Sequence, residues 1–208
     1  MKLVIFDYDG VVMDTFAAIK RIYSDTSSAF NLNLPDNDAF YKDLLELDWR
    51  ITLAKLKIIS KKDIAKQEKI YIDGLKKYDD IIRPYLDIKD ALEKLSKKYT
   101  IAIVSNAYKE EIEYRLKKHN LRDFFKAVFT PADGELKPHP DLLKKCMKQF
   151  NTMPSETAFI GDMDGDIACG KSAKISKIIA VTYGFHLKHR LKDADIIIDS
   201  PKELLTVL

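Results

Sequence analysis

Short runs of apolar residues, each followed by polar residues, recur along this chain and alternate with segments of helical periodicity. The first run covers residues 3–6 and ends at Asp7. Runs of this kind are typical of buried strands in a parallel sheet that helices cover on both faces. Alternation of such strands with helices predicts an α/β fold with a doubly wound parallel sheet. The later runs that predict strands lie at 100–104, 127–130, 158–161, 177–182 and 195–198.

Apolar residues spaced three or four positions apart predict helices between these runs. Ser60, with Asp63 three residues later, has the form of a capping box at the start of one of them. The expected helices cover about 15–30, 37–45, 60–78, 88–95, 109–118, 141–150 and 166–173.

The stretch from Asp14 to Tyr85 shows helical periods and no convincing strand. An all-helical block of this length, placed between the first strand and the next, is best explained as a small helical bundle of its own. We therefore expect an α/β core made of residues 1–13 and 86–208 and a helical insert made of residues 14–85.

Composition limits the classes of partner. The net charge is only +3 over 208 residues, and the charges are interspersed, which argues against nucleic acid as a partner. No apolar run approaches the ~18 residues of a membrane span, so no membrane partner is expected. Cys146 and Cys169 lie inside apolar helical patterns without metal-ligand spacing, and we interpret both as small core residues. These observations together predict a cytoplasmic protein.

Acidic residues follow two of the predicted strands. Parallel strands present their carboxyl ends at one edge of the sheet, where open α/β sheets hold ligands, so side chains scattered in sequence can converge there. Carboxylates without a cluster of Cys or His suit Mg²⁺ rather than zinc. The residues expected to meet at this edge are Asp7, Asp9, Ser105, Lys137, Asp162 and Asp166.

Four segments carry a resemblance to a known family. The chain resembles the haloacid dehalogenase superfamily, in its Asp-x-Asp phosphatase branch related to phosphoglycolate phosphatases and β-phosphoglucomutases. The resemblance implies a helical cap at the position of the insert. The four segments are Phe6-Asp7-Tyr8-Asp9-Gly10-Val11, Val104-Ser105-Asn106, Leu136-Lys137-Pro138-His139-Pro140-Asp141 and Phe159-Ile160-Gly161-Asp162-Met163-Asp164-Gly165-Asp166.

The resemblance also implies roles for individual side chains. Asp7 would be the nucleophile that forms an aspartyl-phosphate, and Asp9 the general acid and then the base. Ser105 would donate to the phosphoryl oxygens with help from Asn106, and Lys137 would neutralise charge on the nucleophile and the phosphate.

The metal site follows from the same resemblance. Mg²⁺ would be held by the Asp7 carboxylate, the backbone carbonyl of Asp9 and the carboxylate of Asp162, with Asp166 adding charge or orienting metal-bound water. A calcium-loop interpretation of 162–173 fails, because position six is Ile167 and position twelve is Ala173.

Several side chains have simpler interpretations. Ser105 or Asn106 could be a helix cap, and Lys137 a solvated loop residue. We interpret Asp164 as solvated, and we identify no partner for His186.

The sequence of the insert gives the least information about function. Arg50 is the best candidate for a residue of the insert that reaches a substrate, because arginine grips carboxylate or phosphate with two parallel hydrogen bonds. Its alternative is a surface arginine beside a buried Trp49.

The sequence therefore predicts a Mg²⁺-dependent phosphatase that acts on a small phosphorylated metabolite such as phosphoglycolate or a sugar phosphate. Hydrolysis of phosphate monoesters is among the slowest uncatalysed reactions, and a carboxylate that attacks phosphate must overcome charge repulsion. A dication and a lysine would remove that obstacle. The alternatives are a phosphosugar mutase, which uses the same aspartates, and a non-catalytic interaction protein. The oligomeric state does not follow from the sequence.

Overall fold

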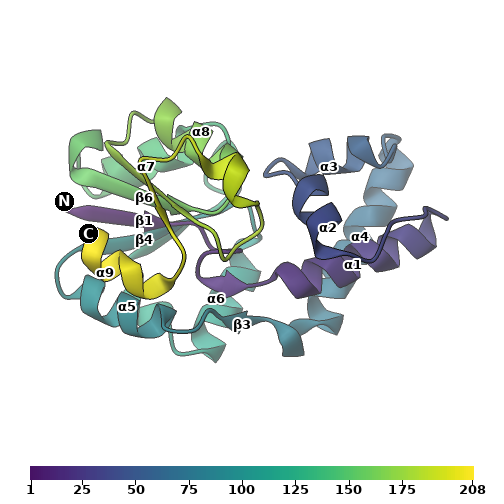
Figure 1. Cartoon of the computed structure of the whole chain (residues 1–208), viewed down its shortest axis with the longest axis horizontal. Helices are drawn as coiled ribbons and strands as arrows, with labels where there is room; N and C mark the ends of the chain where they lie inside the picture. The colour runs from purple at the N-terminus through teal and green to yellow at the C-terminus, as the bar shows by residue number, and fades with distance from the viewer.

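A six-stranded parallel sheet organises the chain in the computed structural model, which describes residues 1–208 (Figure 1). The strand order is β5-β4-β1-β6-β7-β8, so the first strand lies at the centre of the sheet. The strands are β1 (Leu3–Phe6), β4 (Thr100–Val104), β5 (Ala127–Phe129), β6 (Thr157–Gly161), β7 (Lys177–Val181) and β8 (Ile196–Ile198).

The two faces of the sheet bury separate hydrophobic clusters. Alternate side chains of β1 point to opposite faces, as a period of two requires. Val4 and Phe6 belong to the cluster under α5, α6 and α9, whereas Leu3 and Ile5 belong to the cluster under α7 and α8. The doubly wound arrangement predicted from the sequence is therefore confirmed. The covering helices are α5 (Ile88–Ser96), α6 (Lys109–Lys118), α7 (Asp141–Gln149), α8 (Asp164–Ser172) and α9 (Leu204–Val207).

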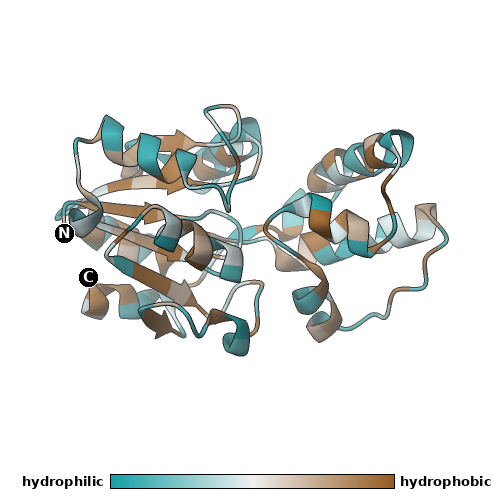
Figure 2. Cartoon of the chain, turned by 90° about the horizontal axis from the view of Figure 1, so that it is seen from above, coloured by the Kyte–Doolittle hydropathy of each residue, from teal (hydrophilic) through white to brown (hydrophobic).

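The helical insert stands beside this core (Figure 1). Its first and last helices, α1 and α4, cross closely, because Gly74 offers no Cβ where the side chain of Ile22 lies against it. Figure 2 shows the strands of the core in hydrophobic colours and much of the outer helix surface in hydrophilic ones. The insert contains α1 (Phe16–Ala29), α2 (Asp38–Leu44), α3 (Trp49–Lys55) and α4 (Lys61–Lys77).

The sequence did not predict helix α3 or a strand in this region. In helix α3 the apolar residues Trp49, Ile51 and Leu53 alternate with polar ones, so the sequence shows no helical period there. Two connections between core and insert pair as a short antiparallel ribbon, β2 (Met13–Asp14) with β3 (Arg83–Pro84). The expectation of no strand before Tyr85 is therefore wrong, because a two-residue ribbon leaves no pattern in the sequence.

Both cysteines are buried and unpaired, as expected for small core residues. No helix is long and apolar enough to cross a membrane.

Candidate active site

The carboxyl ends of the three central strands bring the predicted residues together. Asp7 follows β1, and its neighbours in the sheet, β4 and β6, end just before Ser105 and Asp162. Lys137 comes from the connection between β5 and α7, and Asp166 from the first turn of α8. The topology of the sheet is therefore what assembles this group from distant parts of the chain.

Lys137 lies between two carboxylates. Its ammonium nitrogen is 2.8 Å from Oδ1 of Asp7 and 2.7 Å from Oδ1 of Asp166. The Lys137 side chain has no solvent exposure, so the alternative of a solvated loop lysine is excluded. Its charge is not lost by burial, because the neighbouring carboxylates raise the pKa of Lys137 above its usual range. Lys137 is therefore a buried cation that is paired with two carboxylates at the carboxyl edge of the sheet.

The Asp7 carboxyl group is held through one oxygen. Oδ1 accepts a hydrogen bond of 2.7 Å from the backbone N–H of Tyr8 and the ion pair from Lys137. Burial raises the pKa of Asp7 to about 7, against the opposing charge of Lys137 and with a further contribution from Asp166. The second oxygen, Oδ2, is left free of both interactions.

The carboxylate of Asp162 has one satisfied oxygen and one buried oxygen without a partner. Oδ2 accepts a hydrogen bond of 2.6 Å from the N–H of Phe185, whereas Oδ1 has none. Oxygens of Asp7, Asp162 and Asp166 lie within 4.8 Å of one another. Burial, together with Asp166 and Asp7, raises the pKa of Asp162 well above its usual value. Crowded buried carboxylates with an orphaned oxygen fit a hard dication bound by oxygen ligands.

Gly10 makes this packing possible. Its φ of 77° lies in the left-handed region, and a Cβ there would overlap the carboxylate of Asp162 and the ring of Phe185. The glycine in the first motif is thus required both by its own backbone conformation and by the side chain of Asp162, which follows the neighbouring strand β6.

Asp9 lies at the wall of the cavity rather than in the buried group. It is half-buried and lines the cavity together with Asp7 and Ser105. Burial raises the pKa of Asp9 above its usual value. A raised pKa favours the protonated form of the carboxyl group, which is the form that a general acid requires.

Ser105 and Asn106 both make contacts within the protein. Oγ of Ser105 accepts the N–H of Ala107 at 3.2 Å, in the turn that precedes α6. The N-cap residue of α6 is Tyr108, so the helix-cap interpretation of Ser105 or Asn106 is wrong. The Asn106 side chain exchanges two hydrogen bonds of 2.8 Å with the backbone of Lys137 and donates a third, of 3.1 Å, to the carbonyl of Leu47. Asn106 thus joins the Lys137 segment to the end of β4 and to the insert.

A cavity of about 400 Å³ lies between the strand ends and the insert. Asp7, Asp9 and Ser105 form part of its wall, and residues from α1, α3, α4 and α6 and from the connecting segments form the rest. This volume is in the usual range for small-molecule sites.

Arg50 does not reach the cavity. Its guanidinium is 2.6 Å from Asp48 at the start of the same helix, and its side chain is 60% exposed. Neighbouring Trp49 lines the cavity mouth and is 41% exposed, so the expected burial of Trp49 is also wrong. Helix α3, which was not predicted from the sequence, determines the orientations of the Trp49 and Arg50 side chains.

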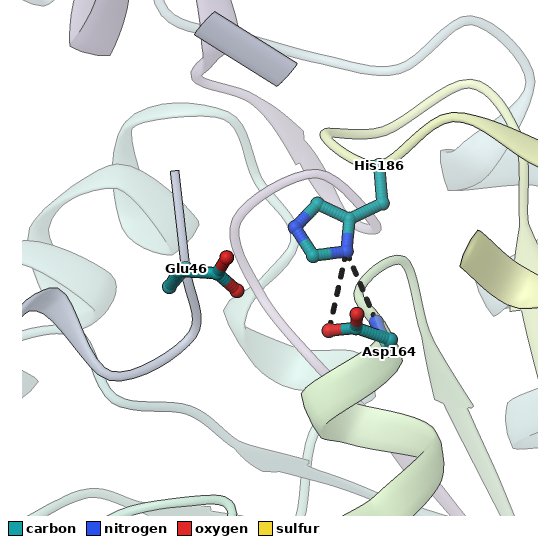
Figure 3. Close-up of side chains that lie close together, drawn as sticks. All are labelled: Glu46, Asp164 and His186. Carbon is teal, nitrogen blue, oxygen red and sulfur yellow. Dashed lines mark hydrogen bonds and ion pairs between the residues drawn. The ribbon is translucent and has the colours of Figure 1, made fainter. Parts of the chain in front are cut away.

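A second cluster joins the insert to the core (Figure 3). Glu46, Asp164 and His186 lie together, and Arg190 forms ion pairs with Glu46 at 2.9 Å and with Asp164 at 2.7 Å. Asp164 is therefore ion-paired rather than simply solvated, and His186 has partners that the sequence did not reveal. Arg190 and His186 carry no motif that could have signalled this contact.

This second cluster is not a metal site. Nδ1 of His186 accepts the backbone N–H of Asp164 at 3.1 Å (Figure 3). The hydrogen is then on Nε2, which donates to the carbonyl of Leu45 at 3.0 Å. With both ring nitrogens engaged, and with Arg190 and Lys55 balancing the charge of Glu46 and Asp164, the cluster is a contact that holds the insert against the core.

The fold and the acidic site define an α/β enzyme of the phosphatase type. Residues 4–181 match the model of the haloacid dehalogenase-like hydrolase family, and the chain belongs to this family. The family generally uses a divalent metal, which agrees with the buried acidic group.

Individual relatives agree with this assignment. The pyrophosphatase PpaX of Oceanobacillus iheyensis is 24% identical over 216 residues, which cover 100% of this chain and 97% of that protein. A haloacid dehalogenase-like hydrolase from Streptococcus pneumoniae has a TM-score of 0.85 at 22% identity, covering 100% of this chain and 98% of that one. A structure described as a predicted phosphoglycolate phosphatase from Haemophilus somnus has a TM-score of 0.85 at 19% identity, covering 100% and 97%.

Proposed function

We propose that the protein is a Mg²⁺-dependent phosphatase that hydrolyses a small phosphate monoester, phosphoglycolate-like or sugar-phosphate-like, through an aspartyl-phosphate on Asp7. The observation that carries the proposal is the position of Lys137 between Asp7 and Asp166, with Asp162 beside them. A structural ion pair would need one acid for one lysine. Three buried acids around one lysine leave negative charge for a dication to balance.

Asp7 attacks through the oxygen that is not already held. Because Oδ1 is occupied by Tyr8 and Lys137, Oδ2 forms the new bond to phosphorus while the bond from phosphorus to the leaving oxygen breaks. Asp9 gives its proton to that oxygen, so the product leaves as an alcohol. Asp9 then takes a proton from water, whose oxygen attacks phosphorus and releases inorganic phosphate and the Asp7 carboxylate.

The carboxylates of Asp7 and Asp162 and the backbone carbonyl of Asp9 would hold Mg²⁺, with Asp166 as the remaining acid. When bound, this ion reduces the repulsion between the anionic nucleophile and the phosphoryl group. Asp166 also accepts the backbone N–H groups of Asp162 and Met163, at 3.3 and 3.2 Å, and so fixes the turn that carries Asp162.

Ser105 and Asn106 act differently in this proposal. The oxygen of Ser105 accepts from Ala107, which leaves its hydrogen to donate to a phosphoryl oxygen. Asn106 is a positioning residue for Lys137, since its amide is engaged with the Lys137 backbone. Arg50, which pairs with Asp48, is not part of the proposal.

We further propose that residues 14–85 form a cap domain over the core, with the ribbon of β2 and β3 as its base. The insert contributes much of the cavity wall and would exclude water from the phosphoryl group while it is bound. Buried, unpaired Cys146 and Cys169 suit a reducing compartment, so we propose a cytoplasmic location and soluble metabolites as partners.

Release of p-nitrophenol from p-nitrophenyl phosphate tests the proposal. Activity should require Mg²⁺, should be removed by EDTA and should be lost in Asp7→Asn. Asp193→Asn, a matched change at an exposed position, should keep full activity. Equal activity in Asp7→Asn and the unchanged protein would overturn the role of Asp7. With a sugar phosphate as substrate, an isomerised sugar without inorganic phosphate would point to the mutase alternative.

A further inference from the structure

Apart from Asp7 and Asp9, the wall of the cavity carries more acids than bases. Its remaining Lys, Arg, Asp and Glu side chains are two cations and four glutamates. The cations are Lys109 and Arg115, and the glutamates are Glu46, Glu68, Glu110 and Glu111. The question is whether either cation is available to an anionic part of a substrate.

Arg115 is fully engaged with the protein. Its Nε lies 2.9 Å from Asp79, its Nη1 lies 2.9 Å from Glu111, and its Nη2 donates to the carbonyl of Leu75 at 3.0 Å. The side chain is 3% exposed. This arginine therefore joins α6 to the base of the insert and offers no free pair of donors to a ligand.

Lys109 pairs with Asp133, an acid that does not line the cavity. Its ammonium nitrogen lies 3.4 Å from both oxygens of Asp133, outside the set of residues that form the cavity wall. Each of the two cations that line the cavity thus already has an acidic partner in the protein.

Two of the glutamates keep their charge uncompensated. Glu68 accepts only the hydroxyl of Tyr108, at 3.0 Å, and neither Glu68 nor Glu110 has a cation within ion-pair distance. Both side chains are exposed where they line the cavity. A negative group on a substrate would be repelled here, by roughly tenfold or more in binding for each close contact.

Much of the remaining wall is aromatic or apolar. Tyr23 and Tyr71 line it from α1 and α4, Tyr108 from the start of α6, and Trp49 from α3. Aromatic side chains provide large, rigid contact surfaces for rings and apolar groups. At about 30 Å³ per water, the cavity has the volume of roughly 13 waters, which leaves room for a ring beyond the phosphoryl group.

We infer that the preferred substrate is a phosphate monoester whose leaving alcohol carries an aromatic or apolar group and no negative charge. The inference rests on the proposed function and narrows its substrate class, because the leaving group of phosphoglycolate is anionic, like that of pyrophosphate, and would be disfavoured here. The proposed phosphoryl site at Asp7 takes one anion, and the glutamates of the cavity wall disfavour a second.

Two isosteric substrates isolate the effect of charge. 4-Carbamoylbenzyl phosphate and 4-carboxybenzyl phosphate differ in one uncharged or charged group that lies far from the reacting bond. The inference predicts a kcat/KM at least tenfold higher for the carbamoyl compound in Mg²⁺. Glu68→Gln should narrow this ratio, whereas Glu93→Gln, a matched change on α5 away from the cavity, should leave it unchanged. Equal rates, or a preference for the carboxy compound, would overturn the inference and leave the phosphatase proposal standing.

Binding without turnover separates the two proposals. The corresponding non-hydrolysable benzylphosphonates can be compared by their shift of the unfolding temperature in Mg²⁺. Tighter binding of the carbamoyl phosphonate, with no hydrolysis of any phosphate ester, would overturn the proposed function but support the recognition argued here. Equal binding of the two phosphonates would overturn the recognition itself.

Discussion

The side-chain amide of Asn106 and the backbone of Lys137 exchange two hydrogen bonds of 2.8 Å, although the residues are 31 positions apart. The pair fixes the segment that carries the buried ammonium against the end of β4. Asn106 acts on the chemistry through Lys137, and a third hydrogen bond to Leu47 connects the same amide to the insert.

Asn106→Ala should therefore lower both stability and turnover. Loss of the amide leaves the N–H and carbonyl of Lys137 without partners, which costs about 1–3 kcal/mol in the free energy of unfolding. We expect a fall in kcat of roughly tenfold or more, because misplaced catalytic groups lose much of their effect. Denaturant unfolding and steady-state kinetics measure both effects. Asn33→Ala, at an exposed position, is the control, and an unchanged kcat in Asn106→Ala would contradict the positioning role.

Lys137→Met should damage the protein in two ways. The change leaves Asp7 and Asp166 buried without their cation, and removing one partner of a buried ion pair costs about 3–5 kcal/mol. Activity should fall by at least the roughly 10²-fold seen when one preorganised charge or donor is removed. Circular dichroism melting and phosphatase assays test this prediction. A stable Lys137→Met variant with normal activity would show that the lysine is dispensable.

Asp162→Asn should have opposite effects with and without metal. In the metal-free chain, the change removes one of three crowded buried carboxylates, so the free energy of unfolding should rise by about 1 kcal/mol or more. Mg²⁺ should raise the unfolding temperature of the unchanged protein by binding the folded state, and this increase should disappear in the variant. Calorimetry with Mg²⁺ and with EDTA measures the two effects. An equal Mg²⁺ increase in both proteins would place the ion elsewhere.

Asp79 should contribute a pH-dependent part of the stability at the base of the insert. Burial by itself would raise the pKa of Asp79, but Lys118 and Arg115 outweigh it and hold the pKa below its usual value of 3.8. Its contribution is therefore complete above about pH 4 and is lost as the pH falls through the lowered value. The free energy of unfolding should drop less steeply below pH 4 in Asp79→Asn. That variant should already be about 2 kcal/mol less stable at pH 7, because Arg115 loses a buried partner. Identical acid profiles for the two proteins would contradict this.

The core and the buried part of the site were predictable because simple rules govern them. Apolar runs that end in polar residues located the strands, and a parallel sheet must collect Asp7, Ser105 and Asp162 at one edge. The sequence could not show that Asn106 holds Lys137, since an amide that binds the backbone leaves no spacing pattern.

The insert and the cavity wall were less predictable. Short helix α3 decides that Trp49 lines the cavity and that Arg50 pairs with Asp48, and the sequence, which shows no helical period there, predicts neither. The contact of Arg190 with Glu46 joins residues 144 positions apart, and only the packing of the insert on the core brings them together.

The central claim is that Asp7 carries the phosphoryl group during turnover. Rapid acid quenching with a substrate labelled in its phosphoryl group, followed by peptide mapping, tests it most directly. The account predicts a covalent, hydroxylamine-sensitive label on the peptide that contains Asp7, dependent on Mg²⁺ and absent in Asp7→Asn. Turnover without any labelled protein, or with the label on another residue, would contradict it.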